Sequence, residues 1–327
     1  MGQANRGTPA HRWSVITASV PGASHARTGL PNQDAVGHSA GAQAPGPAPG
    51  EPLVLALADG HGSPHCFRSD VGSRIAVDVA LHTLSRFLRD RHDLPGGEVD
   101  REAPRLPAEL VERWLEQVGR HLAEHPFASE EIALLRAKTE APADADALRA
   151  TPAELPDGAA ALAYGSTLLA VALTDGFALF LQLGDGDILL VPDGEGEPQP
   201  ALPPDPALIA NETTSLCMPQ AQRHFRYRFL ALDDAAPRLI LASTDGYPNS
   251  FQDDADFRKV GSDLRNTLRT DGMAPVAQAL PGWLSDASLE GSGDDATLGL
   301  LWRLDPAPIA EDAVPPAAQA CPGEPAP

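Results

Sequence analysis

Several aspartates in this 327-residue chain stand where apolar segments end or begin. Asp59 follows PLVLALA and Asp245 follows RLILAST, and neither is followed directly by a second apolar run. Asp34 in LPNQDAVGH and the pair Asp294-Asp295 before ATLGLLW lie at similar borders. Carboxylates brought together from such distant segments repel one another unless a cation compensates them, and oxygen ligands of this kind suit Mg²⁺ or Mn²⁺. The pattern is compatible with a divalent-metal site, and ordinary turns at strand ends are the simpler alternative.

The dipeptide Asp-Gly occurs seven times and is by itself a turn signal, because Gly tolerates positive φ and Asp bonds its own backbone. Asp175 follows LLAVALT, but a second apolar run begins at once, which predicts a hairpin turn. The motifs Gly165-Ser166-Thr167 and Gly184-Asp185 open and interrupt the same apolar segment. We interpret both as structural in origin, with Asp185 in a position that could lie near a metal.

Apolar and β-branched runs predict at least eight strands, which come in groups and do not alternate regularly with helices. They cover residues 13–20, 51–59, 167–191 (three runs), 225–232, 238–244 and 296–302. Helical spacing covers 69–90 and 107–125, and a third helical zone, 254–288, is expected to break near Pro275 and Pro281. Strands in runs and helices in pairs predict an α+β fold with helices packed on antiparallel sheets. Residues 40–52, 93–107 and 138–158 are expected to form loops.

Composition sets further limits on function. The formal net charge of −21 disfavours nucleic acid and anionic membranes as partners. No apolar run approaches the ~20 residues of a membrane span, and the N-terminus lacks the apolar middle of a signal peptide, so we expect a cytoplasmic protein. The three cysteines (Cys66, Cys217 and Cys321) are widely separated, which argues against a disulfide framework. We expect an N-terminal tail at 1–11, one domain at 12–305 and a disordered, Pro/Ala-rich tail at 306–327.

Six short motifs follow one another along the chain: NQDA (32–35), ADGHGS (58–63), GST (165–167), LGDGD (183–187), LASTDG (241–246) and GDDAT (293–297). This ordered set resembles the metal-dependent type 2C protein Ser/Thr phosphatases and is closest to their bacterial branch. The resemblance extends from about residue 13 to residue 303. It implies an antiparallel β-sandwich flanked by helix pairs, in α-β-β-α order, with a two-metal centre at one end of the sandwich.

The resemblance also implies metal-binding roles for individual residues. Asp59 matches the aspartate that bridges the two ions, and the carbonyl of Gly60 matches a further ligand. Asp245 and Asp294 match the other metal aspartates, and Asp34 matches the aspartate of the first motif, near the second metal. Some bacterial members hold a third ion; Asp157 is a candidate ligand that we leave out of the site.

The implied chemistry is hydrolysis of a phosphoserine or phosphothreonine monoester by a metal-activated water. Two neighbouring Mn²⁺ or Mg²⁺ ions neutralise charge on the phosphoryl oxygens and lower the pKa of a bridging water. The alkoxide is a poor leaving group, so a positioned acid helps, and His61, directly after Asp59 and Gly60, matches the family's proposed general acid. The implied partners are phosphorylated proteins and a cognate Ser/Thr kinase in bacterial signalling.

The chain departs from the family pattern at three positions. Gln33 replaces the usual Glu, Asp295 replaces the usual Asn, and Gly29 stands where the family has its phosphate-binding Arg. Arg27 and Arg68 are alternative phosphate-binding candidates, each weighed against a role as solvated surface charge. These departures keep two alternatives open: a pseudophosphatase that acts as a binding or regulatory module, and a metal-dependent hydrolase of small phosphoesters.

Overall fold

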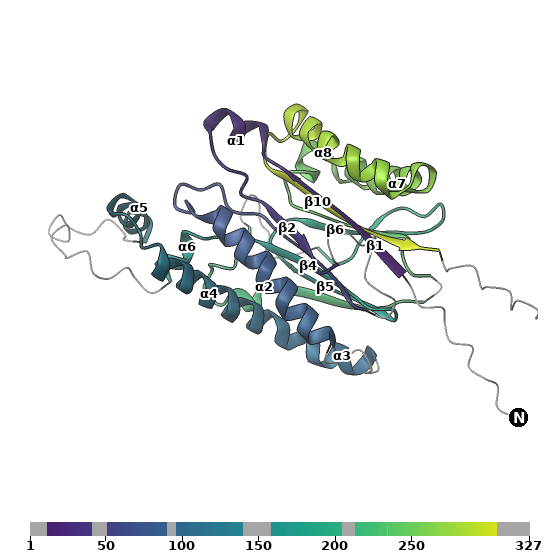
Figure 1. The fold of residues 1–327 in the computed structure, drawn as a ribbon, viewed down its shortest axis with the longest axis horizontal. Coiled ribbons are helices and arrows are strands. Elements are labelled where there is room, and N and C mark those ends of the chain that lie inside the picture. Colours follow the sequence, from purple (N-terminus) through teal and green to yellow (C-terminus); the bar gives the residue numbers. More distant parts are fainter. Residues whose placement is uncertain are drawn as a thin grey trace, which may run out of the picture.

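The centre of the protein is a pair of five-stranded antiparallel sheets that face each other (Figure 1). The computed structural model describes residues 12–40, 51–89, 96–139, 158–204, 213–233 and 235–305. The strands are β1 (Arg12–Val20), β2 (Ala35–His38), β3 (Leu53–Ala58), β4 (Leu168–Leu173), β5 (Phe177–Leu183), β6 (Asp187–Val191), β7 (Gln199–Pro200), β8 (Arg226–Ala231), β9 (Leu239–Ser243) and β10 (Ala296–Leu304). One sheet has the order β1-β10-β9-β6-β7 and the other β2-β3-β4-β5-β8.

Three strands of the second sheet, β3, β4 and β5, are buried along their whole length. Each is covered on one face by the opposite sheet and on the other by helices, so both sets of alternating side chains must be apolar. This double burial explains why the sequence shows continuous apolar runs in these strands and no polar–apolar alternation.

Helices cover the outer face of each sheet, which produces four layers in α-β-β-α order (Figure 1). On one side, α2 (Ser69–Arg89) packs on β2 and β3, and α4 (Leu106–Glu124) packs on α2. On the other side, α7 (Asp254–Asp271) contacts β6 and α8 (Met273–Glu290) contacts β1. The remaining helices are short: α1 (Ala23–Thr28), α3 (Gly96–Glu102), α5 (Ser129–Thr139), α6 (Ala159–Leu162) and the 3-10 turns η1 (Ala103–Arg105), η3 (Ala221–Arg223) and η4 (Pro248–Ser250). The predicted sandwich flanked by helix pairs is confirmed.

The third helical zone breaks near the first predicted position, at Gly272, and does not break near Pro281. The φ of Gly272, 83°, is a left-handed value that glycine tolerates best. Pro275 lies in the first turn of α8, where a missing N–H costs no helical hydrogen bond, and Pro281 lies inside that helix. Residues 93–107, expected to be a loop, contain α3 and η1. Asp175 lies in the hairpin turn between β4 and β5, as predicted.

The predicted tails at 1–11 and 306–327 lie outside the described residues, as do residues 41–50 and 140–157 of the predicted loops, including Asp157. Within the described part of the chain, no helix combines the length and the apolar character that crossing a membrane requires.

Candidate metal centre

Aspartates from five segments converge at one end of the sandwich. Asp59 directly follows β3, Asp245 lies two residues after β9, and Asp185 lies in the turn between β5 and β6. Carboxylate oxygens of these three residues lie within 4.8 Å of one another. Asp34, directly before β2, and Asp294, two residues before β10, also act electrostatically on Asp59. We call these five residues the acidic cluster.

The pKa values within the acidic cluster show its unfavourable electrostatics. Burial, with a smaller effect of Asp295, raises the pKa of Asp34 to about 7. Burial also raises the pKa of Asp59 well above its usual value, and the charges of the other four members raise it further. The pKa of Asp245 rises to about 6, through burial and then through Asp185 and Asp294. Carboxylates that resist ionisation at neutral pH are stabilised as anions when a cation binds among them.

Two further observations fit a divalent cation at this place. Oδ1 of Asp34 and Oδ1 of Asp185 are buried and have no hydrogen-bond partner. Buried polar atoms normally have a partner, so such oxygens are available as ligands. The donor set consists of hard carboxylate oxygens, which suits Mg²⁺ or Mn²⁺ better than a thiophilic metal.

Hydrogen bonds hold two members of the cluster in place. The hydroxyl of Thr244 donates to Oδ2 of Asp34 at 2.7 Å, which leaves the other oxygen of that carboxylate without a partner. The amide of Asn249 donates to Oδ2 of Asp245 at 3.0 Å. Each carboxylate is therefore oriented by a neutral donor that does not compete with a cation for the charge.

The Gly165-Ser166-Thr167 motif fixes the backbone around Asp59 and His61. The N–H of Asp59 donates to Oγ1 of Thr167 at 2.9 Å, and the N–H of Thr167 donates to the Asp59 carbonyl at 2.8 Å. The N–H of His61 donates to the Gly165 carbonyl at 3.1 Å. The structural interpretation of this motif agrees with these contacts, which couple it directly to the metal loop.

His61 is half-buried beside the acidic cluster. Burial lowers the pKa of its imidazole, and the negative charge of Asp185 opposes this effect. The imidazole of His61 is therefore a titratable group next to the candidate metal ligands.

Gln33 joins the first motif to the metal loop. Its carbonyl accepts from the N–H of Gly60 at 3.1 Å and from the hydroxyl of Ser73, and its amide donates to Oγ of Ser69 at 2.7 Å. A Cβ at Gly60 would lie 2.7 Å from this same carbonyl, so only glycine fits there. The bond to Ser69 is the contact among these that depends on the side chain, and Gln33 makes it as a donor without adding a further negative charge.

Asp295 holds the segment that follows β1. Its Oδ1 accepts from the N–H of Gly22 at 2.6 Å, and its Oδ2 accepts from the N–H of Gln33 at 2.7 Å. His25, on α1, places Nδ1 at 3.0 Å from Oδ2 of Asp295 and Nε2 at 3.9 Å from Oδ1 of Asp294. Two backbone donors require two oxygen acceptors, which explains the Asp at a position where the family has Asn.

The two arginines suggested as phosphate ligands have different environments. Arg27 is exposed on α1 and donates to Oγ of Ser24 at 3.0 Å, at the end of the molecule where α1 approaches Asp294. The guanidinium of Arg68 instead donates to the Glu131 carboxylate, to Tyr164 and to two backbone carbonyls, which uses all five N–H groups. Arg68 has no donor left for a phosphate in this arrangement, so we do not retain it as a phosphate ligand.

Two residues at this end of the protein were not among the predicted site residues. Asp185 was interpreted as part of a structural turn that could lie near a metal, and its carboxylate does lie with those of Asp59 and Asp245. The signal that identifies it is its place at the border of β6, the same criterion that found Asp59. His25 was not considered, because a histidine in a short loop-like segment carries no signal of its own.

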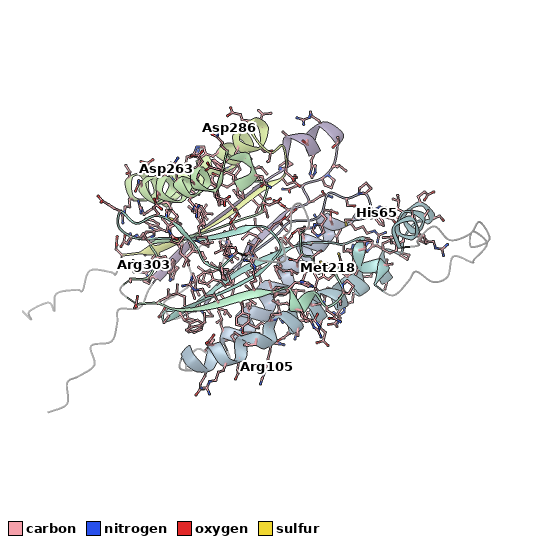
Figure 2. The ribbon with its side chains drawn as sticks, turned by 180° about the vertical axis from the view of Figure 1, so that it is seen from behind. His65, Arg105, Met218, Asp263, Asp286 and Arg303 are labelled. Atoms are coloured by element: carbon pink, nitrogen blue, oxygen red, sulfur yellow. The ribbon has the colours of Figure 1, made fainter. Side chains whose placement is uncertain are left out.

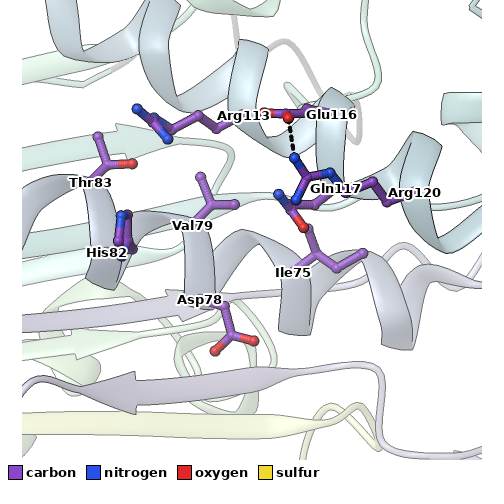
Figure 3. Close-up of a pocket in the computed structure, with 9 residues that line it drawn as sticks. All are labelled: Ile75, Asp78, Val79, His82, Thr83, Arg113, Glu116, Gln117 and Arg120. Atoms are coloured by element: carbon purple, nitrogen blue, oxygen red, sulfur yellow. Dashed lines mark hydrogen bonds and ion pairs between the residues drawn. The ribbon is translucent and has the colours of Figure 1, made fainter.

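A separate cavity of about 430 Å³ lies between α2 and α4, away from the acidic cluster. Figure 3 shows its lining, in which Arg120 pairs with Glu116. The lining residues are Ile75, Asp78, Val79, His82, Thr83, Arg113, Glu116, Gln117 and Arg120. None of them belongs to the acidic cluster, so this cavity does not take part in the candidate metal site.

Two facing sheets with helices on their outer faces carry a carboxylate cluster at one end, an α-β-β-α arrangement suited to binding divalent metal ions. The sequence profile of the family described as protein phosphatase 2C matches residues 21–285. The chain therefore belongs to the protein phosphatase 2C family and is a metal-dependent protein serine/threonine phosphatase.

Solved structures with the same fold include several bacterial phosphatases. The catalytic domain of PstP, in complex with two manganese ions, is 18% identical with a TM-score of 0.50 over 90% of this chain and 100% of that one. Stp1 from Staphylococcus aureus is 10% identical with a TM-score of 0.53, over 93% and 100% of the two chains. PppA of Pseudomonas aeruginosa is 18% identical with a TM-score of 0.51, over 90% and 98%. At these identities the similarity concerns the fold. A search of curated proteins finds no significant match.

Proposed function

We propose that the acidic cluster holds two Mn²⁺ or Mg²⁺ ions through Asp34, Asp59, the Gly60 carbonyl, Asp245 and Asp294. The observation that carries this proposal is the convergence of Asp59, Asp185 and Asp245 within 4.8 Å, at a place where burial and mutual repulsion raise carboxylate pKa values. The complex of PstP with two manganese ions supports the number of ions and one choice of metal. Asp185 borders the ions as an additional negative charge.

The ions, when bound, supply an activated water and neutralise charge on the phosphoryl group. The side chains of this protein protonate the leaving oxygen and bind the phosphate. His61 is anchored through its backbone by Gly165, beside the place where the leaving oxygen departs, and in its protonated form a ring nitrogen donates a proton to that oxygen. Burial disfavours this protonated form, and the charge of Asp185 favours it.

The phosphate itself needs a further positive partner, because its outward oxygens are not all covered by metal ions. Arg27 is our candidate for this role. It lies on α1, two residues after His25, whose Nε2 lies 3.9 Å from Oδ1 of Asp294. Its guanidinium is exposed and makes one hydrogen bond, to Ser24, within its own helix.

The substrates in this proposal are proteins that carry phosphoserine or phosphothreonine. A cognate Ser/Thr kinase phosphorylates them, and the phosphatase acts on them in the cytoplasm. The net charge of −21 disfavours nucleic acid and membrane partners. It favours substrates whose residues around the phosphorylated position are basic, because these lower the repulsion on approach.

Phosphate release from a phosphothreonine peptide tests the proposal. We expect turnover with Mn²⁺, loss of turnover with a chelator, and loss of turnover in Asp59→Asn even with Mn²⁺ present. Asp175→Asn, in the β4–β5 hairpin turn, is the matched control and should retain activity. Metal binding without any turnover would favour the pseudophosphatase alternative, and turnover of small phosphoesters alone would favour the small-molecule hydrolase.

A further inference from the structure

Each N–H group of the Arg68 guanidinium has a hydrogen-bond acceptor. Its Nε and Nη2 donate to the two oxygens of Glu131 at 3.2 and 2.9 Å. Its Nη1 donates to the His125 carbonyl at 2.6 Å and to the Tyr164 hydroxyl at 2.9 Å, and Nη2 also reaches the Pro126 carbonyl at 3.3 Å. An arginine used in this planar, bidentate manner is a structural connection that lysine cannot reproduce.

The partner of Arg68 is the first turn of α5. Oε2 of Glu131 accepts from the N–H of Ala128 at 2.7 Å and so also caps the start of this helix. The guanidinium carbon lies 4.6 Å from the ring centroid of Phe127, in the turn that precedes α5. Arg68 thus binds the capping carboxylate and the entry turn of the same helix.

Among the described side chains of α5, Leu135 is fully buried and Ala133 and Leu134 are exposed, and the helix also contacts α6. The carbonyl of Leu134 accepts from Nδ1 of His65 at 3.1 Å. A helix with so small an apolar contact depends strongly on polar connections such as the one to Arg68.

The helix α5 that Arg68 binds lies beside the loop that carries His61. His65 lies four residues after His61, so α5 touches the loop that carries the candidate general acid. Tyr164, which accepts from Arg68, directly precedes the Gly165 whose carbonyl accepts from His61. Figure 1 places α5 at the same end as α1, and Figure 2 shows His65 at this end and Arg303 at the opposite one.

We propose that Arg68 is a positioning residue that holds α5 beside the His61 loop, where α5 contacts the polypeptide around the phosphorylated residue of the substrate. This proposal rests on the proposed phosphatase function and specifies how that site distinguishes a phosphoprotein from a small phosphoester. Arg68 acts through α5, and it touches neither the phosphate nor the metal ions. A small aryl phosphate carries no polypeptide for α5 to contact, so its turnover should not depend on Arg68.

The experiment compares the full-length wild type with Arg68→Gln, Arg68→Lys and Glu131→Gln, which retains an oxygen for the Ala128 N–H. Arg120→Gln is the matched control, because Arg120 is an exposed arginine on α4 paired with Glu116. Steady-state kinetics with Mn²⁺ use a phosphothreonine peptide and para-nitrophenyl phosphate. Hydrogen exchange of residues 129–139 reports on α5 without any need for activity.

The Arg68 and Glu131 variants should raise KM for the phosphopeptide about fivefold or more, with kcat and the aryl phosphate constants nearly unchanged. Exchange in α5 should accelerate about tenfold or more, and Arg120→Gln should change neither readout. An equal rise in KM for both substrates would make Arg68 a phosphate ligand and overturn the proposal. Unchanged exchange in α5 would also overturn it. A wild type without phosphatase activity would contradict the proposed function, while the exchange experiment would still decide whether Arg68 holds α5.

Discussion

The carboxylate of Asp295 accepts a 2.7 Å hydrogen bond from the backbone N–H of Gln33, 262 positions earlier in the sequence. Gln33 in turn bonds the Gly60 N–H, so the last motif of the chain, the first motif and the metal loop are connected through two consecutive hydrogen bonds. The candidate metal ligands Asp34, Asp59 and Asp294 each lie next to a residue of this connection. Their relative positions are thus set by the backbone before any ion binds.

Asp295→Asn should lower the free energy of unfolding by about 1–3 kcal/mol, because an amide offers one oxygen to two backbone donors and leaves one buried N–H unpaired. Urea denaturation in the presence of a chelator measures this effect without a contribution from metal binding. Asp263→Asn, at an exposed position on α7, is the control. Equal stability of the two variants would contradict the structural role of Asp295.

His61→Gln should slow turnover of phosphopeptides while leaving Mn²⁺ affinity nearly unchanged, because we propose it as a proton donor and not as a ligand. The defect should be smaller with aryl phosphates, whose leaving groups need no proton. Parallel kinetics on the two substrates measure the difference. A defect of the same size on both would exclude the acid role.

The metal-free protein should lose stability as pH rises. The folded pKa values of Asp34 (about 7) and Asp245 (about 6) lie above 3.8, the ordinary pKa of an aspartate, so the folded state holds protons that the unfolded state releases. Their contribution to stability is fully present below about pH 4 and is lost between about pH 4 and 7. Thermal unfolding with chelator at pH 5 and 8 should show Asp34→Asn gaining stability relative to wild type at the higher pH, and Mn²⁺ should remove this difference. If the stability difference between Asp34→Asn and the wild type were the same at both pH values, the raised pKa of Asp34 would not be its cause.

Arg27→Ala should lower kcat/KM for phosphopeptide by about ten- to hundredfold, the size expected for a lost hydrogen bond to a charged group. The aryl phosphate should be affected to a similar extent, because Arg27 is proposed to contact the phosphate. Arg12→Ala, at the exposed start of β1, is the control. Wild-type kinetics in Arg27→Ala would remove it from the site.

The fold was predictable because burial on both faces of β3, β4 and β5 leaves long apolar runs in the sequence. Asp59 and Asp245 were distinguishable from hairpin residues such as Asp175 because no apolar run follows them directly. The absence of a following apolar run does not identify Asp185, since a carboxylate in a tight turn between two strands has the local sequence of an ordinary turn; only its place at a strand border indicated that it could lie near a metal.

The structural role of Arg68 could not be predicted from the sequence, and the reason is different. Its partners are Glu131 and the turn before α5, and α5 has no apolar periodicity because it buries little besides Leu135. A helix held mainly by polar contacts leaves almost no pattern in the sequence. The predicted break near Pro281 does not occur, whereas the break predicted near Pro275 lies at Gly272, a glycine that ends a helix.

Titration calorimetry of Mn²⁺ into the chelator-stripped protein tests the central claim most directly. Wild type and Asp175→Asn should each bind two ions, and Asp59→Asn should lose affinity by at least ~100-fold, since even residues that only support a ligand cost 10–100-fold. Asp245→Asn should behave like Asp59→Asn. Binding by Asp59→Asn and Asp245→Asn that equals the wild type would contradict the proposal that the acidic cluster is the metal centre.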